Sequence, residues 1–329
     1  MNGALTPRQE VQLPHAPALL YNNLQPHGGG AYVSYATDSA VYTVRASTGA
    51  PCFKPLRFPC GQVQHLAALQ DDAEQNIIVV VVLSACMAVI VVNGRQVHVL
   101  PEKGGDTALT CAAVARVAGK DEMVVAVGAS NGIPLCCRCT LDGHPVASAE
   151  VTAPVQAHAQ RSITALDLEA VGEASRVEMA SGDAGGHVVL WADSNPTHTI
   201  PPESDTDAVT CVRLVSVSNT VAVAYGGGQI KLIQRSSGAV TIAIQAHSRW
   251  INAMVYSAAR HWLASAAEDG QISVWDVTSV DPNRVCIASG TVTNELPTGL
   301  AFLSNMGDLL AASYDVVKLR CFPLPGKGR

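Results

Sequence analysis

Three bulky apolar residues, Trp191, Ile233 and Trp275, are separated from one another by steps of 42 positions. Each ends a short segment that begins with a turn glycine and continues with apolar residues at alternate positions; the three segments read GHVVLW, GQIKLI and GQISVW. Alternation with a period of two is typical of a β-strand and not of a helix. A segment repeated at a fixed distance of this size predicts an array of similar structural units.

Weaker copies of the segment extend this array over most of the chain. We place their terminal apolar residues, here called anchors, at Val44, Val92, Cys137 and Phe322, so that successive anchors lie 48, 45, 54, 42, 42 and 47 positions apart. Four-stranded propeller blades recur about every 40–45 residues. The sequence therefore predicts an all-β chain with a single seven-bladed β-propeller of four-stranded antiparallel blades, because a closed ring covers both faces of every blade.

The ends of this array set the predicted domain boundaries. We expect a flexible N-terminal segment at residues 1–13, the propeller at residues 14–322 and a mobile C-terminal tail at residues 323–329. The last unit ends one strand short, so a strand must come from elsewhere in the chain. We expect Pro17–Leu24 to supply the outer strand of the seventh blade and to clasp the two chain ends together.

Composition and charge exclude several classes of protein. The net charge is −6 and the 21 basic residues form no run, whereas a nucleic-acid binder normally shows a basic stripe. The ten cysteines show no repeating pairs, which favours reduced, buried thiols in a cytoplasmic compartment. The apolar stretch Ile77–Val92 is shorter than the ~20 residues of a spanning helix and is rich in β-branched residues, so we expect two buried strands with a turn near Cys86 and no membrane span.

Two further motifs imitate reactive sites. Gly128–Gly132 matches the G-x-S-x-G nucleophile elbow, but apolar strand-like runs precede and follow it, whereas an elbow needs a helix after the turn. Cys136, Cys137 and Cys139 lack the second cysteine pair that a structural zinc site needs. We expect no catalytic residue, metal ion or cofactor.

The best preserved unit, Ala246–Val277, resembles the WD-repeat family. It has Ala-His near its start, Leu-Ala-Ser in its second strand, Asp-Gly in the next turn and Trp-Asp at its close. The resemblance implies a buried hydrogen-bond chain that runs from the indole of Trp275 through the hydroxyl of Ser265 and the imidazole of His247 to the carboxylate of Asp269. A buried carboxylate has to be hydrogen-bonded, so such a chain is physically sound.

Ser265, His247 and Asp269 are also the residue types of a nucleophilic triad. An active triad needs an accessible serine, an oxyanion hole and a substrate cleft, and a serine in a packed strand followed by two alanines supplies none of these. Only this unit has all four residues of the chain in the expected places. The unit that ends at Trp191 has His158 and Ser181 but Gly185 in the place of the aspartate.

Across nearly its whole length the chain is similar to one family within the WD-repeat proteins, that of WD repeat-containing protein 54. The similarity rests on short motifs: Leu20–Leu24, Ala224–Ile230, Ser237-Gly238, Gln245–His247, Ser265–Asp269, and Gly307 through Asp315. It implies a non-enzymatic interaction protein built mainly of one propeller, with a link to ciliated or flagellated cells.

The geometry of the WD-repeat family implies that the residues after the histidine, and the residue before the turn aspartate, lie on one rim of the ring. These candidate partner-binding positions are Arg161, Tyr225, Arg249, Trp250, Glu268 and Tyr314. Arginine, tryptophan and tyrosine are enriched at the energetic centres of protein interfaces. The alternative is that Trp250 packs on its own loop and that the arginines are merely solvated.

We therefore predict a cytoplasmic, non-enzymatic protein–protein interaction scaffold that uses the loop rim of the propeller and is linked to cilium, flagellum or signalling assemblies. Its expected partners are other proteins, self-association included, and not nucleic acid. The alternative function is a propeller enzyme or small-ligand binder that uses the central channel. The expected inner strands offer mainly Thr, Cys and Asn with one acidic residue, Asp167, so we expect the channel to be unreactive.

Overall fold

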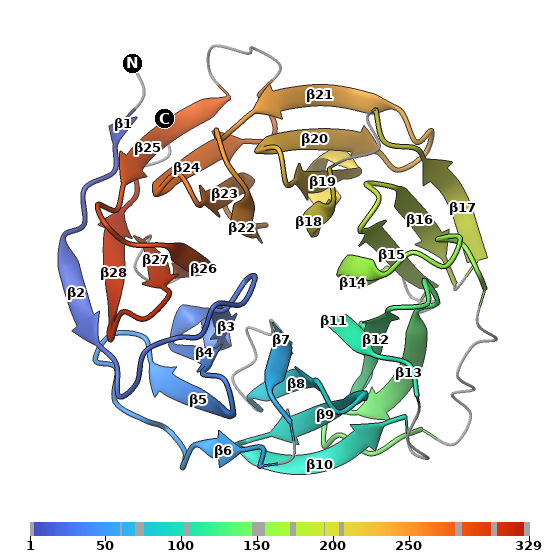
Figure 1. Cartoon of the computed structure of the whole chain (residues 1–329), viewed down its shortest axis with the longest axis horizontal. Helices are drawn as coiled ribbons and strands as arrows, with labels where there is room; N and C mark the ends of the chain where they lie inside the picture. The colour runs from blue at the N-terminus through green and yellow to red at the C-terminus, as the bar shows by residue number, and fades with distance from the viewer. Residues whose placement is uncertain are drawn as a thin grey trace.

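The computed structural model describes residues 3–59, 61–69, 76–101, 106–146, 155–171, 176–193, 195–203, 207–279, 285–303 and 308–325. In these residues seven β-sheets stand side by side around a common centre (Figure 1). The helical elements among them are two short 3₁₀ helices, η1 (Gly28–Gly30) and η2 (Ser216–Ser218). The predicted seven-bladed β-propeller is confirmed.

Each blade runs from an inner strand near the centre to an outer strand at the circumference. Blade 1 comprises β3 (Gln25–His27), β4 (Tyr32–Ala36), β5 (Ala40–Arg45) and β6 (Leu56–Arg57). Blade 2 comprises β7 (Val63–Ala68), β8 (Ile78–Leu83), β9 (Met87–Val92) and β10 (Arg95–Leu100). Blade 3 has three strands within the described residues, β11 (Leu109–Arg116), β12 (Glu122–Ala129) and β13 (Leu135–Thr140).

The other four blades follow in chain order. Blade 4 comprises β14 (Ile163–Val171), β15 (Arg176–Asp183), β16 (Val188–Ala192) and β17 (Asn195–Ile200). Blade 5 comprises β18 (Val209–Val215), β19 (Thr220–Tyr225), β20 (Gln229–Gln234) and β21 (Val240–Gln245). Blade 6 contains β22 (Ile251–Ser257), β23 (Trp262–Ala267), β24 (Gln271–Asp276) and β25 (Cys286–Thr291). Blade 7 contains β26 (Pro297–Leu303), β27 (Asp308–Ser313) and β28 (Lys318–Pro323).

The anchors of the sequence repeat all occupy the same strand of their blades. Each lies in the third strand: Val44 in β5, Val92 in β9, Cys137 in β13, Trp191 in β16, Ile233 in β20, Trp275 in β24 and Phe322 in β28. The apolar stretch Ile77–Val92 forms β8 and β9 with the turn between them, as predicted. The repeat is visible in the sequence because the third strand of a blade is covered on both faces by its neighbours.

The outer strand of the seventh blade is not the predicted one. It is β2 (Gln9–Gln12), which pairs antiparallel with β28 and places Val11 opposite Leu319. The prediction that Pro17–Leu24 closes the ring is therefore wrong, and so is the prediction of a flexible segment at residues 1–13, of which residues 3–13 are described. The physical reason is that polar and apolar residues alternate in this segment, which buries Val11 and Leu13 against the last blade while Glu10 faces outward.

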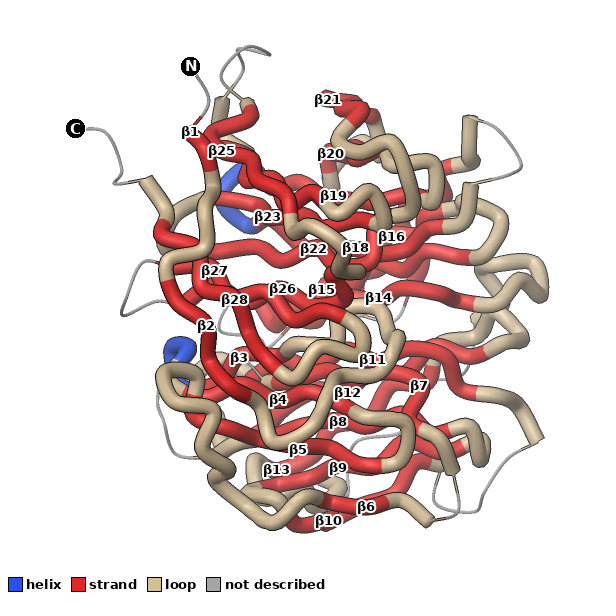
Figure 2. Tube along the Cα trace, turned by 60° about the vertical axis from the view of Figure 1, so that its left-hand side comes forward, coloured by secondary structure: helices blue, strands red, loops and turns tan. Residues whose placement is uncertain are grey.

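Residues 3–13, here called the N-terminal strap, join two blades (Figure 2). Before β2, the short strand β1 (Gly3–Ala4) pairs in parallel with β25 of blade 6, and the side chain of Leu5 is buried beside it. The carboxylate of Glu10 then accepts hydrogen bonds from Lys318 at 3.0 Å and from Arg320 at 2.6 Å. At the other end of the chain, residues 326–329 of the predicted tail lie outside the described residues.

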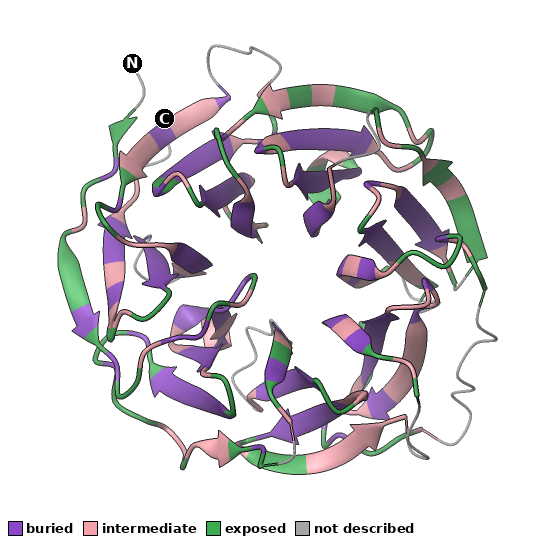
Figure 3. Ribbon diagram, viewed as in Figure 1, coloured by how far each residue is buried: buried purple, intermediate pink, exposed green. Residues whose placement is uncertain are grey.

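The core consists of layers between neighbouring blades (Figure 3). Every residue of β8, which reads IVVVVL, is buried, because both faces of this strand are covered by adjacent blades. The outer strand β21 alternates between exposed and partly buried residues instead. The residues that remain exposed therefore lie mainly on the outer strands and in the loops at the two ends of the strands (Figure 3).

Two further observations concern the chemistry of the whole chain. None of its described helices is long and apolar enough to span a bilayer. The nine cysteines among the described residues are all free thiols, and four of them, Cys111, Cys139, Cys211 and Cys321, are buried.

Candidate functional site

The predicted hydrogen-bond chain of blade 6 is present in the structure. Trp275 donates its indole N–H to the oxygen of Ser265 at 2.9 Å, Ser265 Oγ lies 2.7 Å from His247 Nε2, and His247 Nδ1 lies 3.2 Å from Asp269 Oδ1. Burial lowers the pKa of His247 although the Asp269 carboxylate opposes this shift. The imidazole is therefore neutral, donates from Nδ1 to Asp269 and accepts the Ser265 O–H at Nε2.

Blade 4 contains a second complete chain. Trp191 donates to Ser181 Oγ at 2.8 Å, Ser181 Oγ lies 2.7 Å from His158 Nε2, and His158 Nδ1 lies 2.9 Å from Asp183 Oδ2. The prediction that only blade 6 has all four residues is therefore wrong. Asp183 stands at the end of β15, two positions before Gly185, and reaches the histidine from there.

The carboxylate of Asp183 also organises its own turn. Its Oδ1 accepts the backbone N–H groups of Gly185 and His187, both at 2.9 Å. Burial alone would raise the pKa of Asp183, but the hydrogen bonds from His158 and from these backbone groups lower it below its usual value. Asp183 therefore stays ionised and holds the turn after β15 against the loop that precedes β14.

These chains are structural and not catalytic. The hydroxyls of Ser181 and Ser265 are fully buried and engaged on both sides, so neither oxygen is open to a substrate. Each chain links the loop before an inner strand to the second and third strands of the same blade. The chains thereby fix the loops on one face of the ring, here called the upper face, at which the second and third strands of each blade are joined.

The predicted partner-binding residues lie in loops and strand ends of the upper face, but they differ in exposure. Arg161, Arg249, Glu268 and Tyr314 are exposed, and Trp250 is half-buried. Tyr225 is only 5% exposed, with the ammonium of Lys231 5.2 Å from the centre of its ring. The prediction that Tyr225 is an exposed residue of the rim is corrected, because its ring packs in the apolar layer between blades 4 and 5, with this lysine of the adjacent strand β20 beside it.

Residues 18–24, here called the channel plug, cross the upper face and reach the inner strands (Figure 1). Asn22 is buried there: its Oδ1 accepts the backbone N–H of Met254 at 3.0 Å, and its own backbone N–H donates to Asn252 at 2.9 Å. The backbone N–H of Asn23 donates to Thr298 on the inner strand of blade 7. The segment expected to close the ring at its circumference therefore lies against the inner strands of blades 6 and 7.

The plug adds residues to the upper face that the sequence prediction missed. Tyr21 stacks on Trp250 with ring centres 6.2 Å apart, and Trp250 covers Gly226, where an added Cβ would lie 2.6 Å from the indole. Burial and the nearby Glu268 carboxylate raise the pKa of Tyr21. Trp250 thus packs on the plug and on blade 5. The motif Leu20–Leu24, which contains Tyr21, was the sequence feature that could have predicted this contact.

Apolar groups of the plug and of blade 7 remain exposed on this face. Leu19 is 55% exposed, Tyr21 41% and Tyr314 45%, and Pro17 and Asp315 join the two segments through a backbone hydrogen bond of 3.1 Å. Exposed tyrosines near arginine are residue types that are enriched at protein interfaces.

A cavity of about 380 Å³ opens at the inner strands of several blades. It contains Asp167, whose pKa is raised by burial, and two residues that the sequence prediction overlooked, His65 and Arg213. Burial and the charge of Arg213 lower the pKa of His65 to about 4, so its imidazole is neutral. Within the described part of the chain, no three His, Cys, Asp or Glu side chains are grouped closely enough to hold a metal ion.

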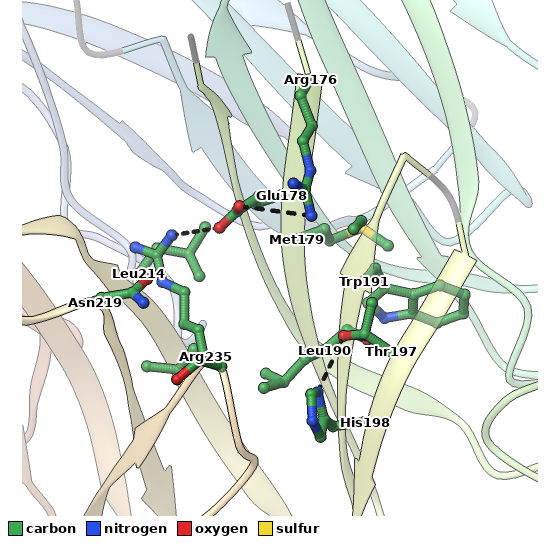
Figure 4. A pocket seen from close by; sticks show the side chains of 13 residues that line it. Arg176, Glu178, Met179, Leu190, Trp191, Thr197, His198, Leu214, Asn219 and Arg235 are labelled. Carbon is green, nitrogen blue, oxygen red and sulfur yellow. Dashed lines mark hydrogen bonds and ion pairs between the residues drawn. The ribbon is translucent and has the colours of Figure 1, made fainter.

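A second cavity, of about 290 Å³, lies between blades 4 and 5 (Figure 4). On one side Arg235 pairs with Glu178 at 2.8 Å and with Glu169, and on the other side lie Trp191 and His198. The side chain of Arg235 is nine-tenths buried between the two carboxylates. This arrangement ties blade 5 to blade 4, because it joins residues of β14 and β15 to the residue that follows β20.

The family model of WDR54 matches residues 75–323, which is most of the chain. The chain belongs to the WDR54 family. A mouse relative, WD repeat-containing protein 54, is 32% identical over 117 residues, which is 35% of each chain. The human protein of that name is 27% identical over 170 residues, or 50% of each chain. The match thus spans about a third of the mouse relative and half of the human one.

The ring of this WDR54-family chain also resembles a solved structure. A chain in a crystal structure of the mitotic checkpoint complex superposes with a TM-score of 0.76 at 18% sequence identity, over 98% of this chain and 95% of that chain. At this identity the likeness shows the propeller fold and nothing of its partners.

Proposed function

We propose that this chain is a non-enzymatic scaffold that binds other proteins through its upper face. The observation that carries the proposal is the composition of this face: exposed Leu19, Tyr21 and Tyr314 lie with Arg249 and Glu268 on loops held by rigid blades. Propellers of the WD-repeat type are generally interaction proteins. No catalytic step is assigned, because the serines that imitate nucleophiles are buried within hydrogen-bond chains.

The experiment compares the proteins captured by the tagged full chain and by two surface variants. A double variant, Arg249→Ala with Tyr314→Ala, changes two exposed residues of the upper face. The matched control is Lys120→Ala, because Lys120 is an exposed cation in the turn between β11 and β12, at the opposite face. We expect the double variant to lose partners that the control retains, at equal melting temperatures. Identical partner sets would reject the upper face.

One observation favours a second candidate function, a small-ligand site in the channel. The cavity of about 380 Å³ brings Arg213, Asp167 and His65 together and is of the size of a ligand site. A thermal-shift screen of small polar metabolites on the wild type and on Arg213→Gln tests it. Stabilisation of the wild type alone would support this function, and the absence of any shift would reject it.

We also propose that the protein works in the cytoplasm and, in cells that have them, at cilia or flagella. The free thiols support a reducing compartment. The link to cilia, flagella or signalling assemblies rests on family resemblance alone. Imaging of the fluorescently tagged full chain in ciliated cells tests it, and a signal outside both the cytoplasm and the cilium would overturn it.

A further inference from the structure

A small polar cavity of about 170 Å³ lies on the upper face between blades 4 and 5. Its wall comes from residues 202, 203 and 207, which precede β18, from the turn between β19 and β20, and from the facing side chains of β20 and β21. The residues that matter are Glu203, Asp207, Tyr225, Gly227, Lys231 and Gln245. Because it lies beside the loop of Arg249, the cavity belongs to the surface proposed above for partner binding.

Tyr225 indicates that the cavity is built to receive a ligand. Its ring is 95% buried, yet its side chain lines the cavity and its hydroxyl has no hydrogen-bond partner among the described residues. The hydroxyl is therefore open to the cavity, where a ligand can bond to it. Burial raises the pKa of this hydroxyl, and the carboxylates of Glu203, Asp183 and Asp207 raise it further, so the phenol stays neutral and offers its oxygen as an acceptor.

The carboxylate of Asp207 is the charge that the cavity leaves unbalanced. The ammonium of Lys231, which is almost fully buried, pairs with Glu203 at 2.9 Å, so these two charges cancel. Asp207 has neither an ion pair nor a side-chain hydrogen bond within the described ranges. A Cβ at position 227 would lie 2.7 Å from Asp207 Oδ2, so the absence of a side chain at Gly227 gives the carboxylate its place beside the turn.

Gln245 supplies a further acceptor. Its Nε2 donates to the carbonyl oxygens of Gly227 at 2.9 Å and of His247 at 2.8 Å, which uses both amide protons. The amide oxygen remains as an acceptor at the cavity. The cavity thus combines an unpaired carboxylate, a phenol oxygen and an amide oxygen under a net negative potential, which is complementary to a cation with several N–H donors.

We propose that this cavity binds the side chain of an arginine or lysine from a partner protein. The inference rests on the proposed function, because it gives the chemistry of one anchor point on the upper face. The cationic group of the partner donates to Asp207, to the hydroxyl oxygen of Tyr225 and to the amide oxygen of Gln245. Lys231 remains paired with Glu203 and holds the ring of Tyr225 in place.

Fluorescence polarisation with the full chain tests the inference. The probes are short fluorescein-labelled peptides of glycine alternating with arginine, with lysine or with citrulline, the last having the shape of arginine without its charge. We expect the wild type to bind the arginine or the lysine peptide and to bind the citrulline peptide at least about tenfold more weakly, because a charge-assisted hydrogen bond contributes roughly that factor.

Two variants locate the binding. Asp207→Asn should weaken binding of the cationic peptide about tenfold, and Tyr225→Phe, which removes only the hydroxyl oxygen, about threefold. The control Asp142→Asn removes the same charge from an exposed residue after β13 and should change nothing. Equal melting temperatures show that all three variants are folded.

Binding of the citrulline peptide as tight as that of the cationic peptides would overturn the inference, and so would equal affinities of the wild type and Asp207→Asn. If that happens while the Arg249→Ala, Tyr314→Ala double variant still loses partners, only the cavity inference fails. If the double variant keeps all partners as well, the proposed function fails with it.

Discussion

The hydrogen-bond chain of blade 4 makes a quantitative prediction about stability. Asp183 is fully buried and accepts three hydrogen bonds, from His158, Gly185 and His187, each at 2.9 Å. A hydrogen bond to a charged group contributes about 1.5–3 kcal/mol, and two of these donors regain some water when the carboxylate is removed. We therefore expect Asp183→Ala to lower the free energy of unfolding by about 3–5 kcal/mol, or the melting temperature by roughly 5–15 °C.

A series of variants separates the charge from the shape of this side chain. Asp183→Asn retains an oxygen for the two backbone N–H groups, but its NH₂ group then faces His158 in place of a charged acceptor, so we expect a loss of about 1–2 kcal/mol. Asp269→Ala should cost less than Asp183→Ala, because Asp269 is 8% exposed and lies 3.2 Å from its histidine. Asp142→Ala, at an exposed position, should stay within about 0.5 kcal/mol of the wild type.

Urea unfolding followed by tryptophan fluorescence measures these differences, and Trp191 lies within the affected chain. Hydrogen bonding lowers the pKa of Asp183 in the folded protein, so its contribution is present above the unfolded value of about 3.9 and is lost as the pH falls through the folded value. The wild type and Asp183→Ala should therefore converge in strongly acidic solution. A loss below about 1 kcal/mol at neutral pH would refute this account of the chain.

Three further predictions concern other parts of the ring. Deletion of residues 1–13 should remove roughly 5 kcal/mol of stability, because three buried apolar side chains of the strap are lost; an unchanged melting temperature would refute the clasp. Asn22→Ala should cost about 1–3 kcal/mol, since the buried N–H of Met254 loses its acceptor, and thermal unfolding of the full chain measures the loss. Burial lowers the pKa of His27 to about 3, so below pH 6.5 this imidazole takes up a proton in the unfolded chain but not in the folded one, and stability should fall by about 1.4 kcal/mol per pH unit. In His27→Phe, the free energy of unfolding in urea should depend on pH less steeply, by the contribution of this one proton.

The sequence could predict the number of blades because every anchor sits in a third strand between two neighbouring blades. The apolar character of this strand is demanded by burial on both faces, and it therefore recurs at a nearly fixed distance. The chain of Trp275, Ser265, His247 and Asp269 was predictable for a similar reason, since all four residues hold fixed positions in one unit.

Three features could not be predicted because they depend on how side chains and segments meet in the folded ring. Strand β2 pairs with a strand that lies some 300 positions later, and a four-residue segment carries too little alternation to reveal this pairing. The aspartate was expected at the position of Gly185, but a carboxylate can reach His158 from position 183 as well. Tyr225 is buried in the apolar layer between blades 4 and 5 with Lys231 beside its ring, and a tyrosine at the end of a strand gives no sign of this packing.

The N-terminal segment couples ring closure to the surface proposed for partner binding. Its first part pairs with blades 6 and 7, and its continuation crosses the upper face, where Tyr21 stacks on Trp250 and Asn22 binds the inner strand of blade 6. A partner that contacts Tyr21 therefore binds only the closed ring. By mass action, such a partner at a concentration of a hundred times its dissociation constant should stabilise the folded full chain by about 2.7 kcal/mol. A partner that binds the opposite face should stabilise the full chain and a chain without residues 1–24 by the same amount. Equal stabilisation of the full and the truncated chain by an upper-face partner would show that the two ends of this segment act independently.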